Sequence, residues 1–179
     1  MRFFLCSHGM YNSVHVINSN NSTIQIASPI HGPVHVTNCK DTIIQIPFSR
    51  QLRIHDCTNV TFVIHVASGP IIEGCKGMQF FQRDCSNALG SDQFDPGANL
   101  YWDVKDFHWL KNNVKSPNFD VCTEAEMEKD SEVSAIVASF EAVSVQDEHD
   151  RDEDNSAENT ITKIMESDIS DEESSEDEL

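Results

Sequence analysis

Histidine, cysteine and arginine are the residue types of this sequence whose spacing suggests chemistry. His15 and His35 are of the right type to share a metal ion, but a protein metal site normally takes about three or four ligands, and no third ligand is evident. The six cysteines form no Cys-x-x-Cys pair of the kind that binds zinc or exchanges disulfides. No glycine-rich phosphate-binding motif and no pair of nucleophile and base is visible. The sequence therefore predicts no metal site, no cofactor and no free-standing enzyme.

The two histidines belong to a pattern that repeats along the chain. One ladder of nearly even spacing holds His15, His35, Arg53 and Glu73. A second ladder holds Gln25, Gln45, Val63 and Gln79. The ladder residues lie in short runs of alternating polar and apolar residues, and such runs recur about every ten residues between residues 10 and 82. Self-similarity of this kind is typical of a solenoid, in which each coil buries its apolar residues only by stacking on its neighbours.

The repeats predict an all-β fold, a parallel β-helix, because coils this short with no helical half do not suit a leucine-rich repeat. In each strand the apolar residues should point into the coil and the polar residues between them outward, so both ladders are expected on the outside. Cys39, Cys57 and Cys75 are evenly spaced along the chain. We expect them to stack at a corner as small buried thiols.

The segment after the repeats is predicted to close the solenoid. Residues 83–100 are rich in turn-forming residues and predict a long loop. Asp103 is expected to cap a short helix in which Val104, Phe107 and Leu110 share one face. That face would cover the open end of the last coil.

Beyond Cys122 the sequence changes character. Thr123-Glu-Ala-Glu126 resembles a capping box and predicts an amphipathic helix over about 124–145, which either folds back or binds a partner. Its apolar positions at helical spacing are Val133, Ile136, Val137, Phe140 and Val143. Residues 146–179 have the composition of an acidic, disordered tail. Three of its serines have an acidic residue three positions later and are candidate sites for an acidophilic protein kinase: Ser170, Ser174 and Ser175.

The charge is distributed unevenly along the chain. Residues 1–122 hold nine acidic and nine basic residues, so the net charge of −18 lies wholly in residues 123–179. Without clustered lysine and arginine, neither a nucleic-acid partner nor an acidic membrane surface is expected. No run approaches the roughly 18 apolar residues of a membrane-spanning helix, and neither a signal peptide nor an acylation signal is expected. The cysteines are accordingly expected to be reduced thiols in the cytosol.

Three segments together carry a resemblance to a known family. They are Ser49-Arg-Gln-Leu-Arg-Ile-His55; Pro70-Ile-Ile-Glu-Gly-Cys75 with Met78-Gln-Phe80; and Asp103-Val-Lys-Asp-Phe-His-Trp-Leu110 with Ser116-Pro-Asn-Phe119. Over about residues 10–120 the chain resembles the tubulin-binding cofactor C family. The domain concerned is shared with the X-linked retinitis pigmentosa protein and, in structure, with cyclase-associated proteins. The resemblance implies a right-handed β-helix and identifies residues 1–122 as a C-CAP/cofactor C-like domain.

The resemblance also implies a function, activation of GTP hydrolysis in trans. The partner would be tubulin, together with tubulin-folding cofactors, or an Arf-like small GTPase, and it would bind the GTP. The family motif Gln-Gln-x-Arg-x-His/Arg carries an arginine finger, which stabilises charge on the transferring γ-phosphoryl group. Arg53 stands at the finger position, Gln51 matches the second Gln, and Arg50 replaces the first. Glu73 is expected to stack beside Arg53 and hold its guanidinium, and Phe107 is expected at the partner interface.

A second function stays open on the sequence alone, a non-catalytic scaffold that binds cytoskeletal or centrosomal proteins. Arg53 discriminates the two, because only GTPase activation requires it. Binding of actin monomers is less well supported, because the domains of cyclase-associated proteins lack the Gln-x-Arg motif. Either of the first two functions implies a cytoplasmic protein, with the cytoskeleton, the centrosome or the base of the cilium as its finer location.

Overall fold

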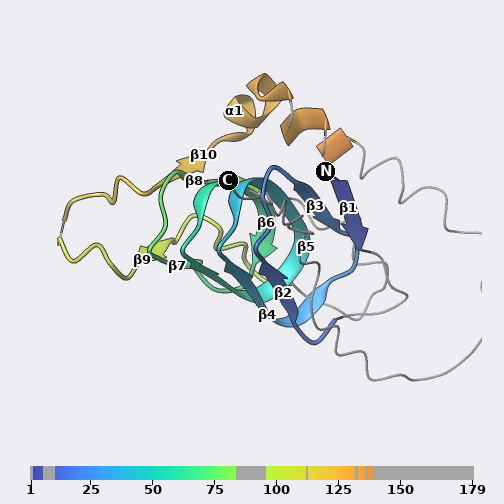
Figure 1. The fold of residues 1–179 in the computed structure, drawn as a ribbon, viewed down its shortest axis with the longest axis horizontal. Coiled ribbons are helices and arrows are strands. Elements are labelled where there is room, and N and C mark those ends of the chain that lie inside the picture. Colours follow the sequence, from blue (N-terminus) through green and yellow to red (C-terminus); the bar gives the residue numbers. More distant parts are fainter. Residues whose placement is uncertain are drawn as a thin grey trace, which may run out of the picture.

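The computed structural model describes residues 2–5, 11–83, 96–111, 113–131, 133–135 and 137–138. Strands make up most of them, and one short helix follows the strands (Figure 1). The elements are β1 (Arg2–Leu5), β2 (Val14–Ile17), β3 (Thr23–Ile26), β4 (Ile30–Thr37), β5 (Lys40–His55), β6 (Thr58–Val66), β7 (Ile71–Glu73), β8 (Met78–Gln82), β9 (Lys105–Asp106), β10 (Phe119–Cys122) and α1 (Glu124–Lys129).

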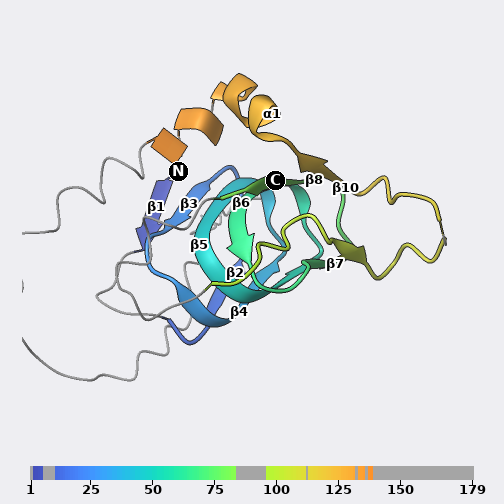
Figure 2. The same ribbon diagram turned by 180° about the vertical axis from the view of Figure 1, so that it is seen from behind.

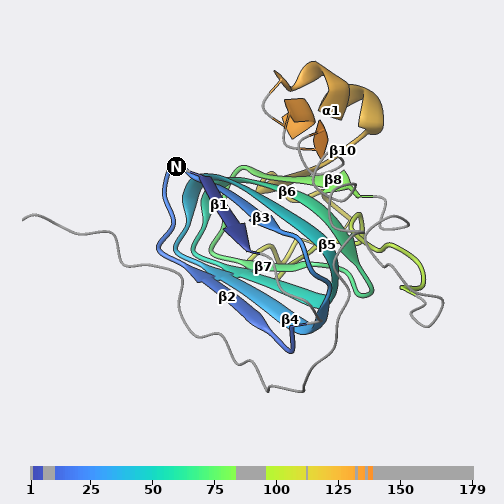
Figure 3. The ribbon, with the colours of Figure 1, turned by 90° about the vertical axis from the view of Figure 1, so that its right-hand side faces the viewer.

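The strands form the stacked coils of a parallel β-helix, which confirms the predicted all-β architecture. One side consists of β1, β3, β5, β6, β8 and β10 in that order, and every neighbouring pair is parallel. A second side consists of β2, β4, the end of β5, β7 and β9 (Figure 3). The long strand β5 belongs to both sides, because its residues Lys40–Ile46 pair with β6 and Arg53–His55 pair with β7.

The core follows from the alternation of apolar and polar residues. Ile24, Ile44, Phe62 and Phe80 stand opposite one another on successive strands, and all four are fully buried. The rings of Phe62 and Phe80 are stacked, with 5.3 Å between their centroids. Because side chains alternate across a strand, stacking coils in register aligns like residues over like and yields one continuous apolar interior.

The cysteine corner lies where the prediction put it. Cys39, Cys57 and Cys75 are buried free thiols in successive turns, and the backbone N–H of Cys39 donates to Sγ of Cys57 at 3.3 Å. The residues on either side of these turns have positive φ, in the left-handed region that Asn, Asp and Gly tolerate best: Asn18, Asn21, Asn38, Asp41, Asp56, Asn59, Gly74 and Gly77. Hydrogen bonds to the thiols of Cys39 and Cys75, together with burial, raise the pKa of the Cys57 thiol. The same hydrogen bonds lower the pKa of the Cys39 and Cys75 thiols to about 7. All three side chains are buried, which gives the corner a packing role.

The prediction of a short helix starting at Asp103 is wrong. Residues 105–106 form strand β9, which extends the solenoid beside β7. The backbone N–H groups of Lys105 and Phe107 donate to the carbonyls of Pro70 and Ile72, at 2.8 and 3.0 Å. Gly69 permits this approach, because a Cβ there would lie 2.1 Å from the carbonyl oxygen of Asp103.

Of the predicted helical face, only Val104 packs against the core, with Tyr101 beside it. Phe107 and Leu110 are 52% and 86% exposed. The closing of the last coil is therefore carried out by a strand and its flanking residues.

The second ladder is confirmed from Gln25 to Val63, and its last member is wrong. Gln25 pairs with Gln45 and Gln45 with Val63, but Val63 stands opposite Phe81, whereas Gln79 stands opposite Thr61. Gln45 and Val63 are buried although they point away from the coil interior. Val63 is covered by the segment after β10, through Val133.

The segment after β10 folds back on the β-helix, one of the two alternatives left open (Figure 2). Val63, Phe81, Cys122 and Val133 form a second apolar cluster with Met127 beside them. The start of α1 is as predicted, since Oε2 of Glu126 accepts hydrogen bonds from the backbone N–H and Oγ1 of Thr123, at 2.7 and 2.8 Å.

The continuous helix predicted from 124 to 145 differs from the structure. The helix α1 ends at Lys129, and Asp130 has extended dihedral angles. Helical backbone resumes at residue 131, where Oδ1 of Asp130 accepts a hydrogen bond from the N–H of Val133 at 3.2 Å. Aspartate favours this capping role, which explains the break. Ile136, Phe140, Val143 and the predicted tail lie outside the described residues. No helix in the described part is long and apolar enough to cross a membrane.

Candidate functional site

The candidate site lies on the side formed by β2, β4, the end of β5, β7 and β9, whose outward residues are called the outer face here. One row across it holds His15, His35, Arg53, Ile71 and Lys105. The rings of His15 and His35 are stacked at 4.7 Å between centroids and 11° between planes. The first three members of the predicted ladder are thus confirmed as neighbours.

Arg53 occupies the centre of this row. Its chain neighbours Leu52 and Ile54 are fully buried, and Arg53 is half-buried with its side chain on the outward side of the strand. Strand β5 pairs with β4 and β7 on either side of Arg53, so its backbone is fixed from both directions. Among the described residues no carboxylate lies within ion-pair distance of its guanidinium. The arrangement presents a positive charge on a rigid support, and no carboxylate of the described ranges neutralises it.

The expected stacking of Glu73 beside Arg53 is wrong. Arg53 stands opposite Ile71, and Glu73 stands opposite His55. The cause is coil length, since the coil that leads from Arg53 to Ile71 is two positions shorter than the coil that leads from His15 to His35. Repeating the longer interval from Arg53 therefore overshoots its true neighbour by two positions and arrives at Glu73.

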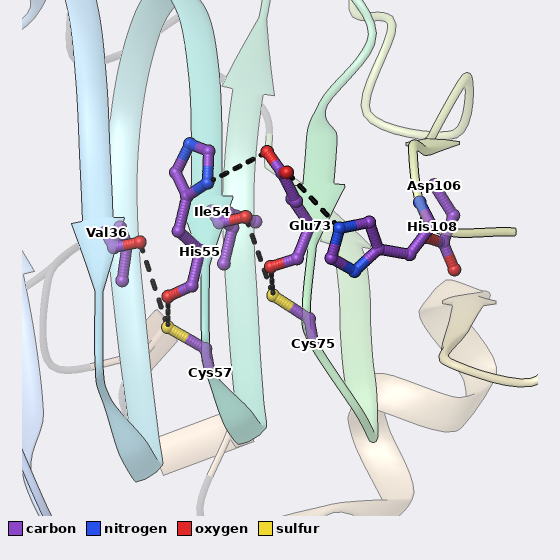
Figure 4. A network of polar contacts seen from close by, with 8 residues as sticks. All are labelled: Val36, Ile54, His55, Cys57, Glu73, Cys75, Asp106 and His108. Atoms are coloured by element: carbon purple, nitrogen blue, oxygen red, sulfur yellow. Dashed lines mark hydrogen bonds and ion pairs between the residues drawn. The ribbon is translucent and has the colours of Figure 1, made fainter.

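Glu73 instead joins two histidines (Figure 4). Its Oε2 lies 3.3 Å from Nδ1 of His55, and its Oε1 lies 3.3 Å from Nε2 of His108. His108 belongs to the segment after β9, so Glu73 connects three parts of the outer face. The carboxylate thus supports the residues that flank Phe107. Sequence reasoning missed His55, although its position two residues after Arg53 indicates the same outward side, and missed His108, whose place depends on β9.

The remaining predicted residues are arranged around Arg53. Gln51 is half-buried opposite Pro33, on the same side of the strand as Arg53. Arg50 is exposed opposite the register irregularity of β4, and its carbonyl accepts a hydrogen bond from Oγ of Ser68 at 2.8 Å. Phe107 follows β9 and is half exposed. Lys105 lies in the row of Arg53 and was not predicted as a site residue. The three candidate phosphorylation sites lie outside the described residues.

The neighbouring charges on the outer face affect the pKa of His35. Partial burial of the ring, and then the positive charges of His15, Arg53 and His55, hold the pKa of His35 below its ordinary value. No three histidine, cysteine, aspartate or glutamate side chains within the described residues are grouped to hold a metal ion. The row is suited to receive negative charge from outside the chain.

The lowered pKa of His35 predicts a pH-dependent stability. The unfolded chain takes up this proton at higher pH than the folded chain, so the free energy of unfolding falls as pH decreases through about 6.5. We expect the His35→Gln variant to lose less thermal stability than the wild type between pH 7.5 and pH 5.5. Melting curves of both proteins measure this, and an equal loss in the two proteins would refute it.

Comparisons with known proteins place these features in a family. The family model of tubulin binding cofactor C matches residues 4–107. The chain is 30% identical over 124 residues to tubulin-specific chaperone C of Bos taurus, covering 66% of this chain and 35% of that protein. It is 47% identical over 60 residues to tubulin-specific chaperone C of Dictyostelium discoideum, covering 34% of this chain and 14% of that protein. The chain thus spans about a third of the length of the first of these relatives.

A solved structure supports the fold. Tubulin Binding Cofactor C from Leishmania major superposes with a TM-score of 0.58 at 23% identity, over 70% of this chain and 86% of that chain. The family model covers more than half of the chain and includes the strand that carries Arg53. The chain belongs to the tubulin binding cofactor C family.

Proposed function

We propose that this chain activates GTP hydrolysis by tubulin, inserting Arg53 into the nucleotide site of its partner as part of tubulin folding. The observation that carries the proposal is the placement of Arg53, half-buried on the outward side of its strand, fixed between two buried neighbours and without a carboxylate partner among the described residues. Tubulin is the partner because the relatives are named tubulin-specific chaperones and a tubulin-folding cofactor. The relatives are longer than this chain, and as part of this proposal we assign their activity to it.

The chemistry explains why arginine suits the role. Charge on the transferring γ-phosphoryl group builds up in the transition state, and a guanidinium delivered in trans stabilises it. Arginine stays protonated and presents several donors in a planar fork. A rigid strand fixes the backbone that presents the side chain, so no backbone ordering entropy is lost on contact. Lys105 in the same row is paired with Asp103 at 3.7 Å, whereas Arg53 has no carboxylate partner among the described residues.

Gln51 and Phe107 complete the proposed contact surface. Gln51 lies on the same side of the strand as Arg53 and can line the contact, and Phe107 offers exposed apolar area after β9, two strands away. Glu73 acts on Arg53 only indirectly, through the segment that it holds with His55 and His108. Such a role places the chain in the cytoplasm with the cytoskeleton, and the centrosome or cilium base remain finer proposals.

The test is single-turnover GTP hydrolysis by tubulin with and without the full chain, in the presence of the tubulin-folding cofactors D and E. A parallel series replaces tubulin by Arf-like GTPases. The proposal expects stimulation of tubulin. Stimulation of an Arf-like GTPase alone would move the same chemistry to another partner, and no stimulation of any partner would leave the non-catalytic scaffold.

A further inference from the structure

A second candidate surface projects from the outer face. The described residues between β9 and β10, 107–111 and 113–118, extend away from the coils and are here called the β9–β10 loop (Figure 1). The loop carries side chains that a chain of this size would ordinarily bury: Leu110 is 86% exposed, Val114 55% and Phe107 52%. Exposed apolar residues gathered on one projection are typical of a protein interaction site.

Hydrogen bonds within the β9–β10 loop fix its conformation. Oδ2 of Asp106 accepts hydrogen bonds from Oγ of Ser116 at 2.6 Å and Nδ2 of Asn118 at 2.7 Å, which joins the two ends of the loop. Oδ1 of Asp106 accepts from the N–H of His108 at 3.1 Å. Burial favours a higher pKa for Asp106, but these hydrogen bonds hold the pKa below its usual range, so the carboxylate stays charged as the acceptor.

A further bond spans the loop between Trp109 and Val114. Nε1 of Trp109 donates to the carbonyl of Val114 at 2.9 Å, and Nζ of Lys111 lies 4.7 Å above the Trp109 ring. Leu110 and Val114 are therefore held on a tied loop, and binding through them would cost little ordering of the chain.

The charge of the loop indicates the kind of partner. The chain carries a net charge of −18, yet residues 107–118 contain His108, Lys111 and Lys115 and no acidic residue. Lys115 is paired with Asp120 at 2.7 Å, but within the described residues no carboxylate lies in ion-pair distance of Lys111. His108 also faces a carboxylate, that of Glu73. The positive charge of Lys111 beside exposed apolar side chains complements an acidic surface with an apolar depression.

The loop is continuous with the face that carries Arg53. Its first residue, Phe107, is hydrogen-bonded through its N–H to the carbonyl of Ile72, and His108 contacts Glu73. We propose that the β9–β10 loop is a docking element that binds an acidic surface of the same GTP-bound tubulin on which Arg53 acts, with Leu110 and Val114 as its apolar anchors. This inference rests on the proposed function for the identity of the partner, but it assigns affinity to the loop and turnover to Arg53.

The experiment separates affinity from turnover in the full chain. The variant carrying both Leu110→Ser and Val114→Ser is expected to bind GTP-loaded tubulin at least about tenfold more weakly, since truncating central anchors has effects of this size. Its hydrolysis rate at a saturating concentration should equal that of the wild type. Lys111→Gln should reduce the salt dependence of binding. The control is Lys76→Ser, an exposed side chain at the cysteine corner, outside the outer face and away from the loop.

Each outcome decides a different point. Unchanged affinity of the Leu110/Val114 variant, or equal weakening in the Lys76 control, would overturn the docking role. Tighter binding would also overturn it and would indicate that acidic residues 139–179 of the chain itself cover the loop. The wild type could bind tubulin without stimulating hydrolysis, while the Leu110/Val114 variant binds it more weakly. That result would support the docking role and refute the proposed function. If the wild type does not bind tubulin, both fall.

Discussion

Alanine in place of Arg53 is expected to lower the stimulated rate of GTP hydrolysis about 10³- to 10⁵-fold, the usual contribution of an arginine supplied in trans. The loss should appear at saturating concentrations of the chain, because the guanidinium acts in the transition state and contributes little to ground-state affinity. Stability should change little, since Arg53 points outward and has no ion pair among the described residues. Single-turnover rates and a melting curve of the variant measure both parts.

Two further variants sharpen this expectation. Arg53→Lys keeps the charge but not the planar fork, so we expect it to recover only a small part of the stimulation. Lys76→Ala removes an exposed positive charge from the cysteine corner, outside the outer face, and should leave the rate unchanged. Equal stimulation by Arg53→Ala and wild-type protein would leave the scaffold interpretation in place.

Truncation of Phe62 should have the largest effect on stability. Phe62 is fully buried, stands opposite Ile44 and Phe80 on the two adjacent coils, and stacks on the Phe80 ring. Phe62→Ala removes contacts to both neighbours at once and leaves a cavity that a stacked solenoid cannot easily close. We expect a loss of about 3–5 kcal/mol in the free energy of unfolding, measured by chemical denaturation.

The same substitution on the surface provides the control. Phe107→Ala truncates a side chain that is 52% exposed, and its effect on stability should stay below about 1 kcal/mol. Similar losses in the two variants would mean that the interior ladder of aromatic and aliphatic residues does not stabilise the fold in the manner described.

Local alternation was enough to predict the coils and the outward position of Arg53. Val34, Leu52 and Ile54 point inward while His35 and Arg53 point outward, and strand geometry alone requires this once the strands are recognised. The cysteine spacing likewise gave the corner. These features depend on residues close in sequence or on an exact repeat.

The errors arose where distant residues decide the outcome. Glu73 was placed beside Arg53 because the coil after Arg53 is two positions shorter than the first one, a change that a count along one strand does not show. The spacing of Val104, Phe107 and Leu110 suits a helix, but residues 105–106 instead form a strand that pairs with β7. That pairing in turn gave His108 its contact with Glu73.

The break at Asp130 has a different origin. The apolar positions from Val133 onward fit one helix, but an aspartate at this point can cap a new helical turn and so interrupts the first. The helical periodicity persists across the break, which is why the sequence pattern did not reveal it.

The most direct test of the central claim compares binding to tubulin·GDP with and without aluminium fluoride, which imitates the transferring phosphoryl group. A residue that acts in the transition state should bind its analogue more tightly than the ground state. We expect aluminium fluoride to raise the affinity of the wild-type chain at least about tenfold and to leave that of Arg53→Ala unchanged. An equal response of the two proteins, or no response of the wild type, would contradict the role of Arg53 as an arginine supplied in trans.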